Sequence, residues 1–192
     1  MESMEMVMAI SMGLALAATC GLRAFLPLFV VGCLGAMGKL ELASTFQWLQ
    51  QPIALAALGL AVVLEIAGDK FPVVDHFLDS AAVVVKPVAA AVAAASVMTD
   101  LDPMVSTILG LVVGGTMAEG VHLLKAKLRL MSSAFTATLA NPILSLIEDV
   151  VALVSTFLAI LLPVVVIVVV VVLAVLGIRR LRGVQVDTSV TD

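Results

Sequence analysis

Charged side chains are scarce in this sequence. Asp, Glu, Lys and Arg together make up 12% of the 192 residues, about half the share that is usual in soluble proteins. Hydrophobic residues make up 62% of the chain, and the mean hydropathy is +1.24. Several uncharged runs approach the roughly 20 residues that a helix needs to cross a bilayer. A chain of 192 residues that contains these runs has no room for a sizeable soluble domain. The scarcity of charge and the long apolar runs indicate a multi-pass integral protein of the cell membrane.

Other features that the sequence lacks argue against particular classes of function. The net charge is −4 and the basic clusters only flank apolar segments, so we exclude a nucleic-acid partner. The sequence contains no nucleophile elbow, phosphate-binding loop or HExxH pattern, which gives an enzyme little support. The two cysteines, Cys20 and Cys33, lie in apolar sequence without a second metal ligand nearby. Such cysteines are typical packing residues.

The apolar runs predict an all-α fold, a polytopic transmembrane helix bundle with six to seven membrane segments, some of them broken or re-entrant. Residues 1–182 form one helical membrane domain in this interpretation, and residues 183–192 form a polar tail that is expected to be disordered. The predicted segments are 6–22, 28–38, 52–64, 76–98, 104–124, 131–149 and 150–178, with a short amphipathic surface helix at 39–51. The last segment is rich in valine, yet in lipid every backbone polar group needs an internal partner, so we predict a helix kinked at Pro163.

Two apolar stretches contain residues that interrupt a helix. Arg23 and Pro27 follow the first run, which predicts a broken or re-entrant helix whose freed backbone groups are buried in protein or face water. A tight interfacial turn between two short helices explains the same residues equally well. A second interruption is expected in the less apolar stretch that precedes the last segment. The predicted structural or re-entrant residues are Arg23, Pro27, Asn141, Pro142, Glu148 and Asp149.

The basic clusters predict an orientation. Residues 125–129 and 179–182 are basic and are therefore expected on the cytoplasmic side, together with the C-terminus. Counting segments from there places the charged hinge at 65–79 on the cytoplasmic side. The acids at 148–149 then fall on the outer side, which requires residues 131–149 to cross the membrane.

The hinge at 65–79 is the most polar part of the chain. Two of its carboxylate pairs are spaced i, i+4, so a continuous helix places each pair on one face. Beyond the hinge, Lys86 lies deep in an apolar run, where a cation needs a carboxylate or a water-filled cavity. The candidate ion- or substrate-binding residues are Glu65, Asp69, Asp75, His76, Asp79, Lys86, Glu119 and His122. Six of them are predicted to converge on one polar cavity: Glu65, Asp69, Asp79, Lys86, Glu119 and His122.

A divalent metal ion is the one cofactor that these residues suggest. Paired Glu-x-x-His motifs build metal sites inside helical bundles, but this sequence contains a single such motif, Glu119 with His122. A single ion needs fewer ligands, and His76 and Asp79 are the further candidates. Structural explanations stay open beside this one: His122 can be a hydrogen-bonded core imidazole, and carboxylates near a helix start are favoured by the helix dipole.

Four separated motifs carry a family resemblance. They are Gly21-Leu-Arg-Ala-Phe-Leu-Pro-Leu-Phe29, Glu65-Ile-Ala-Gly-Asp-Lys-Phe-Pro-Val-Val-Asp-His76, Lys86-Pro87 and Asn141-Pro-Ile-Leu-Ser-Leu-Ile-Glu-Asp149. In this order they resemble the domain-of-unknown-function 4126 family over residues 10 to 160. The resemblance implies a small multi-pass membrane protein and brings no established activity with it.

The residues support two hypotheses for function. Interrupted helices with buried carboxylates favour a small transporter or channel for a cation, either a proton or a divalent metal. The alternative is a lipid-binding or lipid-handling protein in which Lys86 and Arg23 meet anionic headgroups, or a non-catalytic subunit of a membrane complex. The expected partners are membrane lipids and a small ion or solute, and the sequence leaves a homo-oligomer open.

Overall fold

The computed structural model describes residues 2–68, 72–136, 141–172 and 175–176, with the backbone alone described at 2, 72–80, 129, 132–136 and 141–142. The predicted tail at 183–192 lies outside these residues. Helices and their connections make up the described chain, which contains no β-strand. The all-α prediction is therefore confirmed.

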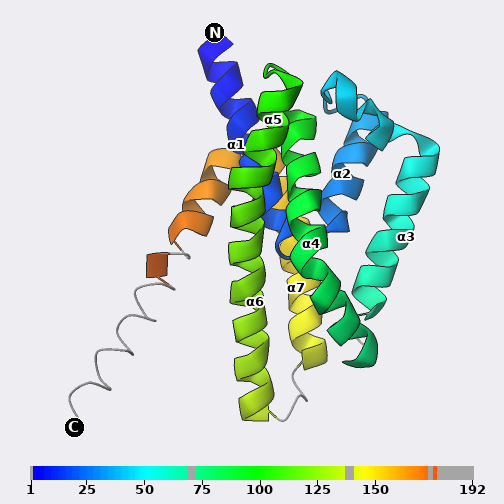
Figure 1. Cartoon of the computed structure of the whole chain (residues 1–192), viewed down its shortest axis with the longest axis vertical. Coiled ribbons are helices and arrows are strands. Elements are labelled where there is room, and N and C mark those ends of the chain that lie inside the picture. The colour runs from blue at the N-terminus through cyan, green and yellow to red at the C-terminus, as the bar shows by residue number, and fades with distance from the viewer. Residues whose placement is uncertain (1, 69–71, 137–140, 173–174, 177–192) are drawn as a thin grey trace.

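The helices form a bundle around α1 (Figure 1). In chain order they are α1 (Glu2–Cys20), α2 (Phe25–Ala36), the 3-10 helix η1 (Ser44–Gln50), α3 (Pro52–Gly68), α4 (Pro72–Val97), α5 (Pro103–Leu109), the π-helical turn η2 (Gly110–Gly114), α6 (Gly115–Thr136) and α7 (Asn141–Leu161). α1 packs against α4, α6 and α7, whereas α3 packs mainly on α2 at the edge of the bundle. α1 and α2 run in opposite directions and form a hairpin, with the connection between them at its tip (Figure 1).

Small residues let the central helices approach closely, as the alanine-rich run in residues 89–95 predicts. Ala90, Ala93 and Ala94 of α4 are fully buried. A Cβ atom on Gly110 would lie 2.7 Å from the carbonyl oxygen of Ala91, so these two helices meet backbone to backbone. Such contacts are the usual basis of helix association in lipid, where apolar side chains gain little by leaving an apolar solvent.

Fewer helices than predicted are long enough to span a membrane. In the described part of the chain, three helices meet the requirement of length and apolarity: Ser3–Cys20, Pro103–Leu128 and Ile143–Leu161. A fourth is added if η1 and α3, which meet at a bend of 67°, count as one span. Shorter apolar helices lie at Phe25–Ala36, Ala81–Val97 and Pro163–Val172. The predicted number of six to seven is therefore too high for the described residues, although apolar helices of this kind indicate a membrane protein.

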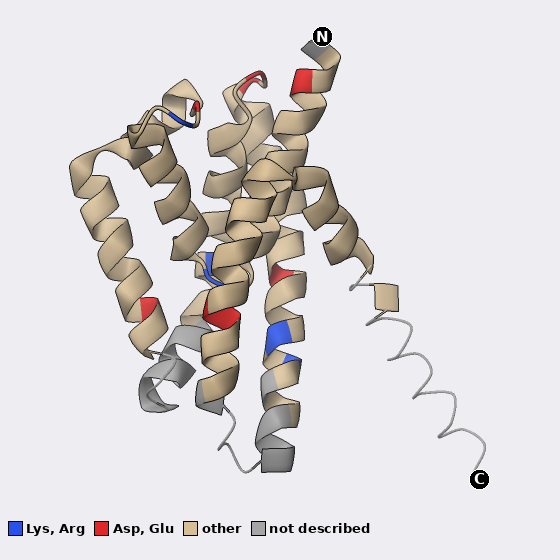
Figure 2. Cartoon of the chain, turned by 180° about the vertical axis from the view of Figure 1, so that it is seen from behind, with Lys and Arg blue, Asp and Glu red and all other residues tan. Residues whose placement is uncertain are grey.

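Two physical causes explain why more membrane segments were predicted than the described structure contains. α2 has only 12 residues, about 18 Å of helix, which is well short of the hydrocarbon thickness of a bilayer. The predicted segment 150–178 is not one helix either, because α7 ends at Leu161 and a new helix begins at Pro163. Proline has no N–H to continue a helix, so the chain breaks at Pro163 where a kink within one helix was predicted. Figure 2 shows that charged residues are few along the described helices, whose long uncharged stretches suit a membrane protein.

Residues 131–149 do not cross the membrane as one segment, so this prediction is wrong. α6 continues to Thr136 and α7 begins at Asn141, so the chain reverses within the predicted crossing (Figure 1). Lys125 Nζ lies 3.1 Å from Glu148 Oε2, which puts these two residues at the same level. The assignment of residues 125–129 and the acids 148–149 to opposite sides is therefore also wrong. Pro142 favours a helix start over a helix interior, because the first turn needs no N–H partner.

Candidate functional site

The site is built around the interruption between α1 and α2. Residues 21–24 belong to neither helix, and Arg23 and Ala24 are only 1% and 2% exposed. The freed backbone groups are therefore enclosed by protein, which agrees with a broken helix. Whether this turn lies within the membrane or at its interface stays a prediction. Pro27 lies in the first turn of α2, where the N–H groups have no partner within the helix and its missing donor costs nothing.

Two lysines meet the carbonyl groups at the end of α1. Lys86 Nζ of α4 donates to the carbonyl oxygen of Gly21 at 2.9 Å, and Lys125 Nζ of α6 donates to that of Leu22 at 3.5 Å. The last carbonyl groups of a helix carry partial negative charge and have no partner within the helix. The ammonium groups supply both the missing donors and the opposite charge.

A carboxylate meets the N–H groups at the start of α2. Glu65 of α3 accepts from Ala24 N at 2.7 Å through Oε1 and from Phe25 N at 3.3 Å through Oε2. Ala24 stands at the N-cap of α2 and has no side chain that could cap the helix. Glu65 therefore acts as the N-cap from a neighbouring helix, at the end where the dipole favours negative charge.

Arg23 ties the interruption to two further helices. Its Nη1 donates to the carbonyl oxygen of Glu65 at 3.2 Å, and its Nη2 donates to Ser145 Oγ at 3.4 Å. Nη2 also forms an ion pair with Asp149 Oδ1 of α7. One buried guanidinium group thus connects α3 and α7 through the tip of the α1–α2 hairpin.

Lys86 has a second acceptor in His122. Lys86 Nζ lies 2.7 Å from His122 Nδ1, and both side chains are buried. An ammonium group can only donate, so Nδ1 accepts and the ring proton of a neutral imidazole lies on Nε2. The requirement that Lys86 find a polar partner at this depth is thus met by a backbone carbonyl and an imidazole.

Among the side chains that the structure describes, the charges around the interruption balance. The three cations are Arg23, Lys86 and Lys125, and the three carboxylates are Glu65, Glu148 and Asp149. Arg23 pairs with Asp149 and Lys125 with Glu148. Pairing lowers the cost of placing charges in an apolar surrounding, which explains how so many ionisable groups fit inside a small membrane protein.

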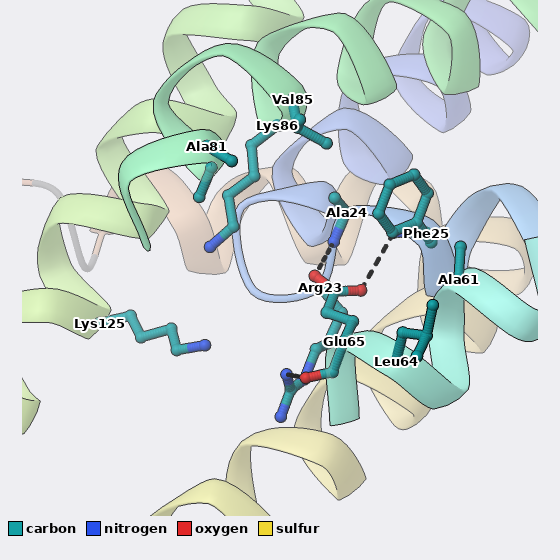
Figure 3. Close-up of a pocket in the computed structure, with 11 residues that line it drawn as sticks. Arg23, Ala24, Phe25, Ala61, Leu64, Glu65, Ala81, Val85, Lys86 and Lys125 are labelled. Carbon is teal, nitrogen blue, oxygen red and sulfur yellow. Dashed lines mark hydrogen bonds between the residues drawn. The ribbon is translucent and has the colours of Figure 1, made fainter. Parts of the chain in front are cut away.

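A cavity of about 270 Å³ opens at this cluster (Figure 3). Its lining consists of Arg23, Ala24, Phe25, Ala61, Leu64, Glu65, Ala81, Ala82, Val85, Lys86 and Lys125. The ammonium groups of Lys86 and Lys125 point toward the same space from α4 and α6 (Figure 3). The two oxygens of Glu65 are bonded to Ala24 and Phe25. The described lining of the cavity thus combines three cations and one engaged carboxylate with apolar residues of α3 and α4.

The predicted site residues divide into three groups. Glu65, Lys86 and His122 meet at the interruption, where they are joined by the predicted Arg23, Glu148 and Asp149. Glu119 lies on α6 outside the cavity lining, and its buried Oε2 has no hydrogen-bond partner among the described residues. The side chains of Asp69, Asp75, His76, Asp79, Asn141 and Pro142 lie outside the described residues. Whether any of these residues binds a ligand stays a prediction.

Lys125 and Ser145 belong to the cluster but were not among the predicted site residues. Lys125 was assigned to a basic cluster outside the membrane, although it follows His122 at i+3 on the same helix face. Ser145 had no local signal beyond its place in the interrupted stretch. Within the described part of the chain, no three His, Cys, Asp or Glu side chains lie close enough to hold a metal ion, and the proposed metal ligands His76 and Asp79 are not among the described side chains.

Comparison with known proteins gives one result. A family model described as a domain of unknown function, DUF4126, matches residues 10–183, which include every charged residue of the cluster. Neither a curated protein nor a solved structure matches the chain.

Proposed function

Since the chain belongs to the DUF4126 family, whose description names no activity, we propose its function from the geometry of its own site. The protein is a multi-pass membrane protein that binds an anionic ligand, carried by a phosphate or carboxylate group, in the cavity at the α1–α2 interruption. The observation that carries this proposal is the described part of the cavity lining, which contains three cations and one carboxylate.

The electrostatics of the lining support an anion. Glu65 is committed to the N–H groups of Ala24 and Phe25, so its negative charge already serves the start of α2. Glu148 and Asp149 neutralise their cations from outside the cavity lining. An anion in the cavity would lie beside the cationic groups of Arg23, Lys86 and Lys125, in a surrounding that strengthens charge interactions relative to water.

The same lining gives less support to the cation transporter that the sequence suggests. A proton or metal ion in this cavity would lie beside three cationic side chains, and repulsion at such distances costs several kcal/mol where water is scarce. Acidic side chains do gather at another cavity, of about 340 Å³, but its acids Glu5, Glu41 and Asp100 are exposed. Exposed carboxylates are screened by solvent and hold cations weakly.

Two sources could supply the anion, a lipid headgroup or a small solute, and phosphate chemistry is common to both. The test measures thermal unfolding of the purified protein in a non-ionic detergent, with inorganic phosphate or dioleoyl phosphatidic acid added. Chloride at equal ionic strength and dioleoyl phosphatidylcholine are the reference conditions. A ligand at about ten times its Kd stabilises by about 1.4 kcal/mol, which raises Tm by roughly 3 to 6 °C in a chain of this length.

Matched variants identify the site. Lys86→Met removes one lining cation and should abolish the rise in Tm, whereas Lys127→Met removes an exposed cation from α6 and should leave it unchanged. If Lys86→Met does not fold, the double variant Lys125→Gln with Glu148→Gln removes another lining cation together with its partner. Equal responses of the Lys86 and Lys127 variants, or no response of the natural protein to either phosphate compound, would rule the proposal out.

A further inference from the structure

We infer that the π-helical turn η2 contains one residue more than an α-helix would need there, and that this surplus residue orients α6 toward the α1–α2 hairpin. α5, η2 and α6 form one continuous helix over Pro103–Leu128 (Figure 1). In a π-helix each N–H group reaches the carbonyl oxygen five residues back instead of four. The N–H group of Gly115 does so with Gly110, and it also reaches Leu111. This role of η2 involves no ligand and goes beyond the proposed function.

The buried residues of this helix recur at a spacing that a straight α-helix cannot keep on one face. Ser106, Gly110, Gly114, Ala118 and His122 are all buried and follow one another at intervals of four residues. Four residues turn an α-helix by about 400°, so each member of the series lies about 40° further around than the last. His122 would therefore lie about 160° from Ser106, on nearly the opposite face. One surplus residue turns the lower part back by about 100° and brings His122 to within about 60° of Ser106.

The exposed residues lead to the same result independently. Thr116, Gly120, Leu123 and Lys127 below the turn are exposed, as Ile108 is above it. In a straight α-helix these four residues would lie about 60 to 120° away from the direction of Ile108. With one surplus residue in η2, all four fall within about 40° of it. A single exposed face along the whole helix thus requires the surplus residue.

Backbone contacts fix the orientation of the helix on both sides of η2. Above the turn, a Cβ atom on Gly110 would lie 2.7 Å from the carbonyl oxygen of Ala91 in α4. Below the turn, the backbone of Ala118 lies against Gly21 at the tip of the hairpin. Rotation of either part would drive a side chain into a neighbouring backbone. η2 therefore joins two parts of one helix whose orientations are set by different neighbours.

The outer side of η2 is suited to hold the surplus residue. Leu111, Val112 and Val113 are exposed, so the number of residues there can change without loss of a buried side chain. The hydroxyl group of Thr116 can donate to the carbonyl oxygen of Val112 or of Val113, each at 2.8 Å. It thereby supplies a donor for carbonyl groups whose backbone partners are displaced by the wider turn.

Single-residue deletions test this role of η2. Deletion of Val112 removes the surplus residue, so η2 becomes α-helical and α6 keeps its orientation. Deletion of Leu124, another exposed apolar residue of the same helix, instead turns Lys125 by about 100° away from Glu148. We expect the Val112 deletion to change Tm by less than about 3 °C. The Leu124 deletion should lower Tm by roughly 10 °C or more, because buried charges lose their partners.

A disulfide measures the orientation of α6 directly. A Cβ atom on Gly115 would lie 3.4 Å from Pro87 Cβ, close to the roughly 3.5 to 4.5 Å that separates these atoms in a disulfide. In a background without the two natural cysteines, Pro87→Cys with Gly115→Cys should form a disulfide on oxidation, and deletion of Val112 should preserve it. Deletion of both Val112 and Val113 removes one residue too many and should abolish it. Thiol labelling before and after reduction measures the yield.

Three outcomes would overturn the inference. Equal losses of Tm for the Val112 and Leu124 deletions would show that η2 contains no surplus residue, and so would failure of the Val112 deletion to fold. Loss of the disulfide in the single deletion would have the same meaning. A disulfide that survives the double deletion would show that the orientation of α6 does not depend on the number of residues in η2. None of these measurements uses phosphate or lipid, so each outcome leaves the proposed anion site untouched.

Discussion

The carboxylate of Glu65 caps a helix to which Glu65 does not belong. Its Oε1 accepts a hydrogen bond from Ala24 N at 2.7 Å across 41 residues of sequence. The contact is reciprocal, because the neighbouring Arg23 donates from its side chain to the carbonyl oxygen of Glu65. Glu65 thus satisfies N–H groups at the start of α2, and Arg23 satisfies a carbonyl group in the last turn of α3. This exchange fixes α3 against the tip of the α1–α2 hairpin and forms one side of the cavity.

Removing the Glu65 carboxylate should therefore destabilise the protein. Glu65→Ala leaves two N–H groups at the start of α2 without acceptors, and we expect a loss of roughly 2 to 4 kcal/mol in the free energy of unfolding. Glu65→Gln keeps one acceptor oxygen and should lose about half as much. Chemical denaturation in detergent measures both, with the exposed Glu41→Ala as the control. Similar losses for Glu41→Ala and Glu65→Ala would contradict the capping role.

The pairing of Arg23 with Asp149 leads to a second prediction. Asp149→Asn leaves a guanidinium group that is 1% exposed without its carboxylate, and we expect a loss of about 3 kcal/mol. In a double-mutant cycle, Arg23→Gln with Asp149→Asn should lose at least about 1 kcal/mol less than the sum of the single changes. A second cycle that combines Arg23→Gln with Glu41→Gln serves as the control and should be additive. Additivity in the first cycle would show that the pair contributes nothing.

The sequence predicts this interruption well because its cause is local. Arg23 and Pro27 in an apolar run have a cost in lipid that does not depend on the rest of the fold. The partners of Arg23 could not be predicted, since Glu65, Ser145 and Asp149 are brought to it by long-range packing that leaves no periodic signal. Lys86 illustrates the same limit. Its need for a polar partner follows from its depth, but the identity of that partner as Gly21 and His122 does not.

The membrane segments were predicted less well, for a different physical reason. Apolarity shows that a stretch can lie in lipid, but it does not show whether the chain continues or reverses there. Residues 131–149 are compatible with either course, and the ion pair between Lys125 of α6 and Glu148 of α7 leaves no signal in the sequence. Treating Lys125 as a flanking charge outside the membrane produced both the false crossing and the missed site residue.

The reversal between α6 and α7 gives the third prediction. In a background with Cys20→Ala and Cys33→Ala, the pair Lys125→Cys and Glu148→Cys should be joined by a short bis-maleimide in intact membranes. The pair Lys125→Cys and Asp100→Cys should not react, because Asp100 precedes the start of α5, and Lys125 lies 22 residues after Pro103 in the continuous run of α5, η2 and α6, about 33 Å of helix rise away. The reverse pattern would restore the crossing at 131–149. A single Lys127→Cys substitution in the same background, labelled with a membrane-impermeant maleimide, then tests the predicted cytoplasmic orientation of this end.

The close approach of α6 to the interruption gives the last prediction, in which two glycine substitutions have opposite signs. A Cβ atom on Gly21 would lie 2.7 Å from Val121 Cβ and would also collide with the carbonyl oxygen of Ala118, whereas a Cβ atom on Gly120 would meet nothing within 4 Å. Gly21→Ala therefore forces α6 away from the hairpin, and we expect a loss of about 1 to 3 kcal/mol in stability. Gly120→Ala should instead gain about 0.5 to 1 kcal/mol, because alanine favours the helical conformation.

Denaturation curves of the two variants measure this difference in sign. Because α6 carries Lys125 and His122 to the cavity, Gly21→Ala should also reduce the rise in Tm that phosphate produces, while Gly120→Ala should preserve it. Gly21 does not have a positive φ angle, so backbone strain would not account for a loss. If both substitutions change stability in the same direction and leave the phosphate response intact, α6 does not pack against the interruption as closely as described, and Lys125 cannot be part of the anion site.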